Sequence, residues 1–111
     1  MIGVRDFYGR IVYWIDGEEI RNFVGQCLYR LDGENVRNFT GSILFRITPE
    51  RITNFFGQPI YMVNGNLVSD FAGPFRYRFS SAKIEDFYGR TLFTIDRPVS
   101  DKVVLAIIAI Q

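Results

Sequence analysis

The side chains that most often carry out catalysis are scarce in this sequence. The chain has one cysteine, Cys27, and no histidine, so a thiolate would have no imidazole base to activate it. Strand parity places Cys27 on the same face as Tyr29 and Leu31, which predicts a small core residue. A single Cys without His also supplies too few ligands for a zinc site. We therefore expect no catalytic residue, no metal and no cofactor, and we predict that the protein is not an enzyme.

Carboxyl and amide side chains recur every sixteen residues, a pattern that could form an acid–base or ligand cluster. Each stands directly before a Phe and three residues before a Gly, at Asp6, Asn22, Asn38, Asn54, Asp70 and Asp86. Asx at the first position of a turn with Gly at the fourth is typical of a type I turn. We interpret all six as turn formers. Glu18, Glu19 and Glu34 are the other acidic candidates for an active site, and no motif brings them together.

Arginine supplies eleven of the thirteen basic residues, and several recur at fixed positions of the repeat. One set is Arg5, Arg21 and Arg37, and a second is Arg30, Arg46 and Arg78, with Arg76 near the last. A stripe of Arg could bind the phosphates of a nucleic acid or a lipid headgroup. The net charge of +1 argues against a nucleic-acid partner and favours a solvated wall with cross-strand pairs to Asp and Glu.

Six Phe residues lie at the tips of the same kind of turn. They are Phe7, Phe23, Phe39, Phe55, Phe71 and Phe87. Exposed, they would form an apolar ring suited to a partner or to self-association. Folded back, they would plug one end of the fold, and we favour the plug because six exposed Phe side chains would promote aggregation. Trp14 and Met62 form a second, weaker candidate patch on the outer face.

One sixteen-residue unit, written six times, positions all of these side chains. The units begin at Val4, Ile20, Val36, Ile52, Val68 and Ile84. Each predicts a short strand, an Asx-Phe-x-Gly turn whose Gly takes a left-handed conformation, and a second strand. Dipeptides such as Asp16-Gly17, Asp32-Gly33 and Asn64-Gly65 predict the hairpins that join the units. The repeat therefore predicts twelve antiparallel strands in an up-and-down meander.

Twelve strands with one apolar face must close or stack to remove their open edges. A closed ring of strands about 4.8 Å apart and tilted about 40° has a backbone diameter of about 24 Å, which leaves about 12 Å between its inner side chains. Residues 103–110 are apolar on every side, and an α-helix is about 10–12 Å wide. We predict a mainly β fold, a closed barrel around this C-terminal helix, with Ser100 and Asp101 at the helix start.

An open or stacked meander with the tail as a strand is the alternative, since five of the residues 103–110 are β-branched.

Composition indicates one domain over residues 1–111, with hairpin repeats at 4–99 and the apolar segment at 100–111. The longest apolar run has eight residues, against about 20 for a membrane-spanning helix. We therefore expect a soluble protein. One Cys permits no internal disulfide, so we expect a reducing, cytoplasmic compartment.

The spacing Asx-x-x-Gly-x-x-aliphatic-aromatic-x-aliphatic, as in residues 86–95, is similar to the repeated hairpins of tubby-like, LURP-one-related and phospholipid-scramblase proteins. That resemblance implies a twelve-stranded barrel around a hydrophobic C-terminal helix. The sixfold short repeat also resembles the small bacterial "four-fold β-flower" proteins, whose family name implies a tetramer. The resemblance covers nearly the whole chain, but it rests on turn chemistry, and no lipid-binding or ion-binding residue is carried over.

Two functions from different classes follow from these patterns. The first is a non-catalytic structural or interaction module of unknown partner, which can form a homo-oligomer through its Phe ring. The alternative is a barrel that binds a lipid or another anionic ligand through its Arg-rich wall. We expect the first, because a regular scaffold without long loops offers few places to assemble an active site.

Overall fold

The computed structural model describes residues 1–111, and it contains twelve strands and one helix. The strands are β1 (Ile2–Asp6), β2 (Ile11–Asp16), β3 (Glu19–Asn22), β4 (Cys27–Asp32), β5 (Asn35–Asn38), β6 (Ile43–Ile47), β7 (Arg51–Asn54), β8 (Pro59–Asn64), β9 (Leu67–Asp70), β10 (Phe75–Ser80), β11 (Lys83–Asp86) and β12 (Thr91–Ile95). The helix, α1, spans Asp101–Ala109.

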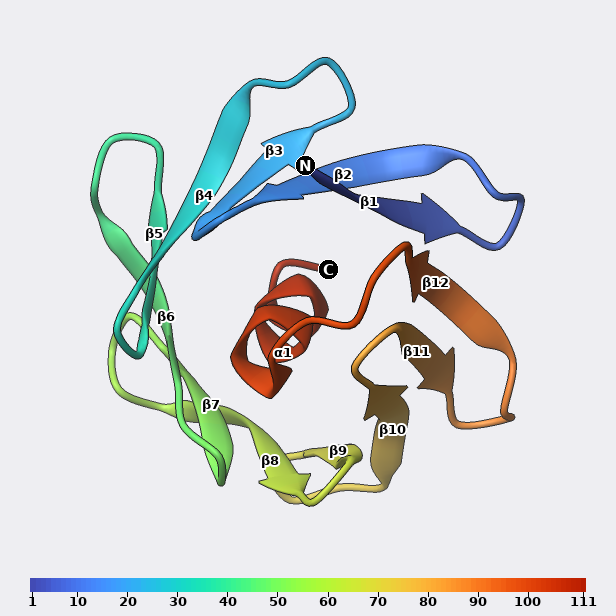
Figure 1. Cartoon of the computed structure of the whole chain (residues 1–111). Coiled ribbons are helices and arrows are strands. Elements are labelled where there is room, and N and C mark those ends of the chain that lie inside the picture. The colour runs from blue at the N-terminus through green and yellow to red at the C-terminus, as the bar shows by residue number, and fades with distance from the viewer.

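All twelve strands form one closed barrel in which each strand pairs antiparallel with its neighbours in the sequence. The ring closes where β1 pairs with β12, with Val4 opposite Ile95. Figure 1 shows α1 at the centre of this ring, with the strands around it. Closure leaves no strand edge exposed, which removes the usual template for edge-to-edge aggregation. The predicted closed, up-and-down barrel around a C-terminal helix is confirmed.

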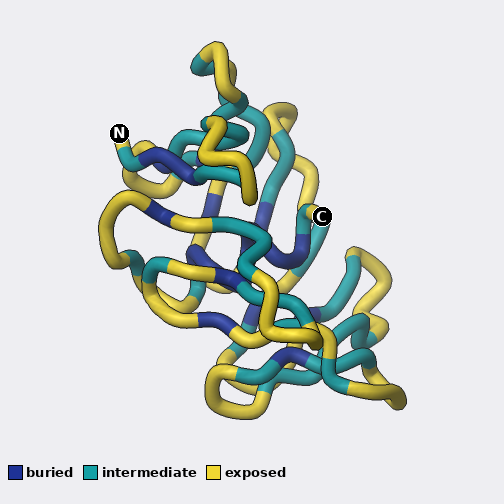
Figure 2. Tube along the Cα trace, turned by 90° about the vertical axis from the view of Figure 1, so that its right-hand side faces the viewer, coloured by how far each residue is buried: buried dark blue, intermediate teal, exposed yellow.

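The core consists of one stripe from the wall and most of the helix. The first residue of each unit is at most 1% exposed: Val4, Ile20, Val36, Ile52, Val68 and Ile84. Residues 103–109 of α1 are all buried, and they belong to the same apolar cluster as the wall residues. Figure 2 shows the buried positions in the middle of the strands and in the helix, and the exposed ones at the hairpin ends. Burial on every side outweighs the low helix propensity of Val and Ile.

The start of α1 differs from the predicted cap. Ser100 has an extended backbone, but its side chain makes no capping hydrogen bond. Its carbonyl oxygen accepts the backbone N–H groups of Val103 and Val104 at 3.1 and 3.2 Å. Asp101 stands in the first turn, where a carboxylate interacts favourably with the helix dipole. The helix therefore begins at the predicted residues, without the side-chain cap.

The two kinds of turn produce different pairings. The hairpins that join units keep a continuous register, and in the first of them Asp16 pairs with Glu19. The loop is thus Gly17-Glu18, with φ of +60° at Gly17, and Gly at the first loop position fits a type II′ turn. Every Asx-Phe-x-Gly hairpin instead carries a register shift. Such a bulge adds one residue to the second strand and increases its twist.

Candidate functional site

The Asx side chain organises each Phe-bearing turn through its backbone contacts. In the first turn, Oδ1 of Asp6 accepts the backbone N–H groups of Tyr8 at 2.9 Å and Arg10 at 3.0 Å. Asn22, Asn38, Asn54 and Asp86 accept the same two N–H groups in their own turns. The turn Gly has a positive φ, for example +82° at Gly9. Five of the six Asx residues therefore form their turns through these contacts, as predicted.

The turn between β9 and β10 departs from this pattern. Pro74 stands where the other turns have a residue with a free N–H, so this position cannot donate to Asp70. Gly73 has no positive φ, in keeping with the restriction that a proline imposes on the residue before it. The Asp70 carboxylate instead accepts a hydrogen bond from Nε of Arg76 at 2.8 Å. In this turn an ion pair therefore stands in place of the side-chain contacts to the backbone.

Electrostatics support the structural role of the Asp residues in these turns. Desolvation acts to raise the pKa of Asp6, but hydrogen bonds from the backbone N–H groups of Arg10 and Tyr8 and the attraction of the Arg10 guanidinium outweigh it, and the pKa is lowered. The pKa of Asp86 is lowered in the same way, against desolvation, by the backbone and side chain of Arg90 and the backbone of Tyr88. Both groups are thus held in the charged form, which suits a hydrogen-bond acceptor.

The prediction that the six Phe side chains fold back as a plug is wrong. They are 54% to 77% exposed, at Phe7, Phe23, Phe39, Phe55, Phe71 and Phe87. The centre of the barrel is occupied by α1 instead, and six wall aromatics, such as Tyr13 and Phe45, pack against the core. The third turn position, between Phe and Gly, is exposed as well where its side chain is large, at Tyr8, Val24, Phe56 and Tyr88.

We call these ten exposed side chains the apolar rim. In Figure 1 the turns that join β1 to β2, β3 to β4, and β11 to β12 lie at the outer edge, farthest from α1. The rim accounts for ten of the twelve large apolar residues that are exposed on the protein, the other two being Met1 and Ile43. Soluble monomers rarely gather so much exposed apolar surface without a contact role.

The first Arg set ties each turn to the preceding unit. Arg5 donates through Nη1 to the carbonyl oxygen of Gly9 at 3.0 Å and through Nε to Asp96 at 2.9 Å. Arg21 and Arg37 make the same contact to the Gly carbonyl of their own turns, and they pair with Asp16 and Asp32, respectively. Arg21 also pairs with Glu19. These three guanidinium groups therefore stabilise the turns and the junctions between units.

The second Arg set is also largely paired. Arg30 pairs with Glu19 at 3.2 Å, and Arg46 pairs with Glu34 at 2.8 Å. Arg78 makes no ion pair, and its guanidinium carbon lies 5.9 Å from the centre of the Phe75 ring. Five of the six candidate arginines are thus neutralised by carboxylates of the chain itself. This arrangement resembles the predicted solvated wall of cross-strand ion pairs more closely than it resembles a phosphate-binding site.

The predictions for Cys27 and for the Trp14–Met62 patch are wrong. Cys27 is half-buried and lies outside the core cluster, because the bulge in its hairpin pairs it with Arg21 and reverses the expected parity. Burial raises the pKa of its thiol, and the nearby Glu19 raises it further.

Trp14 and Met62 stand on β2 and β8, which lie on opposite sides of the twelve-stranded ring. The indole N–H of Trp14 donates to the carbonyl oxygen of Phe23 at 3.2 Å.

Of the three acidic candidates for an active site, Glu19 and Glu34 have structural partners, and the side chain of Glu18 is exposed. A hydrogen bond from Arg30 is the largest influence that lowers the pKa of Glu19, and Arg21 adds to it against desolvation. Oε1 of Glu34 accepts hydrogen bonds from both Nε and Nη2 of Arg46. No group of three or more His, Cys, Asp and Glu side chains is placed to hold a metal ion.

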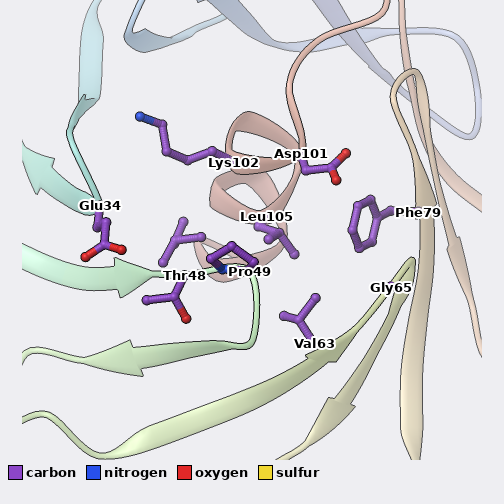
Figure 3. A pocket seen from close by; sticks show the side chains of 10 residues that line it. Glu34, Thr48, Pro49, Val63, Gly65, Phe79, Asp101, Lys102 and Leu105 are labelled. Atoms are coloured by element: carbon purple, nitrogen blue, oxygen red, sulfur yellow. The ribbon is translucent and has the colours of Figure 1, made fainter.

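A pocket of about 480 Å³ opens between α1 and the barrel wall. Figure 3 shows Leu105 of the helix and Val63 and Phe79 of the wall around it, with Asp101 and Lys102 above. Nζ of Lys102 donates to the carbonyl oxygen of Gly33 at 2.7 Å, and the pocket explains why Val63 is only half-buried. Its mouth combines both charge signs, so it does not select one class of charged ligand.

No protein-family model, curated protein or solved structure matches this chain. These comparisons therefore assign no family, and the candidate site is defined by the geometry of the barrel alone. No helix of the structure combines the length and apolar character that a membrane crossing requires. Of the residues singled out in the sequence, the six Phe form an exposed surface, whereas the Arg sets serve mainly the fold.

Proposed function

We propose that the protein is a non-catalytic interaction module that binds a macromolecular partner through the apolar rim. The observation that carries this proposal is the exposure of ten large apolar side chains on hydrogen-bonded turns. Five of the six turns are held by Asx contacts to their backbone, so the backbone of these turns loses little conformational freedom on binding. Aromatic residues, Phe included, are enriched at the cores of protein interfaces.

The alternative function, an Arg-rich wall that binds a lipid or another anionic ligand, has weaker support. It needs guanidinium groups that are free to receive phosphate, and the ion pairs of the wall occupy most of them. The barrel around a C-terminal helix does support an architectural kinship with tubby-like and β-flower proteins, and we keep that kinship as a proposal. It assigns no ligand to the rim or to the wall.

Replacing rim residues tests the proposed function directly. A variant with Phe23, Phe39 and Phe55 changed to Ser keeps every Asx and Gly of the turns, so it should unfold at the same temperature as the wild type. We expect it to lose the partners that chemical cross-linking recovers with the wild-type protein in its own cells, and to lose any self-association seen by sedimentation.

The matched control is Ile43→Ser, which removes an exposed apolar residue outside the rim. It should retain the same cross-linked partners as the wild type. If the triple Phe variant keeps the wild-type partners and the wild-type sedimentation behaviour, the rim is not the binding surface. Co-sedimentation with anionic liposomes that persists in the triple variant, and is lost when Arg30 and Arg46 are changed to Gln, would establish the Arg-wall alternative instead.

A further inference from the structure

One inward-facing residue of the wall is less buried than its equivalents in the other units. Near the end of the second strand, this residue is at most 5% exposed in five units, at Ile15, Leu31, Ile47, Phe79 and Ile95. In the fourth unit the position is Val63, which is only half-buried. Because Val is smaller than Ile, Leu or Phe, the fourth unit fills less of the space between the wall and α1.

The helix and the adjacent turn leave the wall uncovered at the same place. α1 packs mainly against β6 and β10, which lie on either side of β8 in the ring. Gly65, in the turn after β8, has a φ of +63°, and no atom beyond its chain neighbours lies within 4 Å of the position that a Cβ would take. The pocket between α1 and the wall is therefore a property of this one unit, and it is open at the turn.

This pocket is large and apolar enough to hold a small molecule. Figure 3 shows Leu105 of α1 facing Val63 and Phe79 of the wall. The volume of about 480 Å³ falls in the usual range of ligand pockets, about 300–1,000 Å³, and an apolar cavity of about 150 Å³ already binds benzene. The Thr48 hydroxyl is used by its own turn, where it donates to the carbonyl oxygen of Arg51 at 3.2 Å. Water beside the apolar side chains has few partners, so an apolar group displaces it favourably.

The mouth of the pocket carries both charge signs. The Glu34 carboxylate is held by Arg46 at 2.8 Å, and Nζ of Lys102 donates to the carbonyl oxygen of Gly33 at 2.7 Å. Adjacent side chains on a helix do not face each other, and Figure 3 shows the Asp101 carboxylate and the Lys102 ammonium on opposite sides of the helix start. A charged ligand would therefore be attracted by one and repelled by the other. A hydroxyl group can donate to the carboxylate or accept from the ammonium.

We propose that this pocket binds a small neutral molecule with an apolar body and a hydroxyl end. The apolar body would contact Leu105 and Val63, and the hydroxyl would lie at the mouth beside Asp101 or Lys102. This inference goes beyond the proposed function, because the pocket shares no residue with the apolar rim and takes a small molecule, whereas the rim binds a macromolecule.

Titration of 1-octanol into the full-length protein, followed by methyl NMR, tests the proposal. We expect the methyl signals of Val63 and Leu105 to shift, with a dissociation constant on the order of 1 mM or lower. The methyl signals of Val24 and Ile43, which are exposed outside the pocket, should not shift. Octanoate and octylammonium have the same chain with a charged end, and each should bind at least about threefold more weakly because it meets a like charge at the mouth.

Filling the pocket tests its location. Val63→Phe introduces the residue that the next unit has at this position, Phe79. It should weaken octanol binding at least about tenfold, which corresponds to the lost burial of about two methylene groups. Val24→Phe is the matched control: it makes the same change on the rim, where Phe56 holds the equivalent position, and it should leave the affinity unchanged. Val63→Ile, which matches Ile47, adds one methylene and should weaken binding about fourfold. This smaller change keeps the test decisive if Val63→Phe does not fold.

Several results would overturn the inference. They are an absence of octanol binding, unchanged affinity in the folded Val63 variants, methyl shifts at Val24 and Ile43 in place of Val63 and Leu105, and binding of octanoate or octylammonium as tight as that of octanol. The last result would exclude a neutral ligand.

The triple Phe variant separates this inference from the proposed function. It should bind octanol as the wild type does, because the three Phe side chains lie outside the pocket. If it binds octanol but keeps its cross-linked partners, the proposed function falls and the pocket stands. If it loses octanol binding, the apolar ligand sits on the rim and the pocket is excluded.

Discussion

At the scale of single residues, the repeat separates side chains that build the barrel from those that are free to bind. An Asx oxygen that accepts two backbone N–H groups leaves the next residue, Phe, outside the hydrogen-bonded loop. The Arg side chains of the first set return to their own turns through the Gly carbonyl. The Phe side chain has no comparable role, so its recurrence is not explained by the fold alone.

Loss of one regular Asx acceptor should destabilise the protein measurably. In the third unit, Oδ1 of Asn38 accepts the backbone N–H groups of Thr40 and Ser42 and the hydroxyl of Thr40. Asn38→Ala should lower the free energy of unfolding in urea by about 1–2 kcal/mol. Asp70→Ala is the matched control, because Asp70 has mainly an exposed Arg76 partner, and it should cost less than about 1 kcal/mol. Equal losses would contradict the role assigned to the Asx oxygen.

Stability should fall in acid because two of the turn acceptors are titratable. The folded-state pKa values of Asp6 and Asp86 lie below their ordinary value. Their stabilising effect is therefore fully present above the unfolded-state pKa of about 4, and it is lost as the pH falls through the folded-state values.

The repeat itself supplies the control for this acid sensitivity. Asn22, Asn38 and Asn54 accept the same bonds without a proton to gain. The Asp6→Asn, Asp86→Asn double variant should therefore lose less stability between neutral pH and pH of about 3 than the wild type does. The melting temperature, measured across this range, decides the point. Parallel pH profiles would show that these two carboxylates are not responsible.

At the scale of elements, strand and turn positions follow from local chemistry, whereas side-chain direction does not always follow. The alternation of Tyr29, Arg30 and Leu31 predicts their faces, because they lie after the bulge. Cys27 lies before it, and a bulge reverses parity without any mark in its own residue type. The exposure of Phe23 could not be predicted either, since it depends on what already fills the barrel.

The helix is the element for which local propensity and tertiary context disagree. Ile107 is fully buried at the centre of α1, so Ile107→Ala should cost about 2–5 kcal/mol of unfolding free energy. Ile110 is only half-buried at the end of the helix, and Ile110→Ala should cost clearly less. Denaturation in urea measures both variants. Similar small losses would mean that α1 does not anchor the core.

Deleting residues 103–111 tests the same element as a whole. The deletion removes the filling of the barrel and exposes the inner faces of the wall to water, so cooperative unfolding should disappear. Differential scanning calorimetry checks this outcome. A truncated chain that melts in one transition at the wild-type temperature would show that the strands close without the helix.

At the scale of the whole molecule, six equivalent units must satisfy one global condition, which is a ring wide enough for a helix. The seam between β1 and β12 has the register of the other unit junctions, since Val4 faces Ile95 as Ile20 faces Ile15. The ion pair of Arg5 with Asp96 repeats there the pair of Arg21 with Asp16. No local signal in the repeat counts the units, so their number must be set by the contents of the barrel.

Changing the number of units should therefore prevent folding even though every local contact is kept. Removal of residues 36–51 deletes one complete unit and leaves ten strands. A ring of ten strands has a backbone diameter of about 20 Å and leaves about 8 Å inside, less than the about 10–12 Å width of a helix. We expect this variant to lack a cooperative thermal transition in circular dichroism. Replacing residues 36–51 with a copy of residues 20–35 is the matched control, because it keeps twelve strands and the same kinds of core residue. The control should melt cooperatively; if the shortened chain does so too with α1 still protected from hydrogen exchange, then barrel width is not set by the helix.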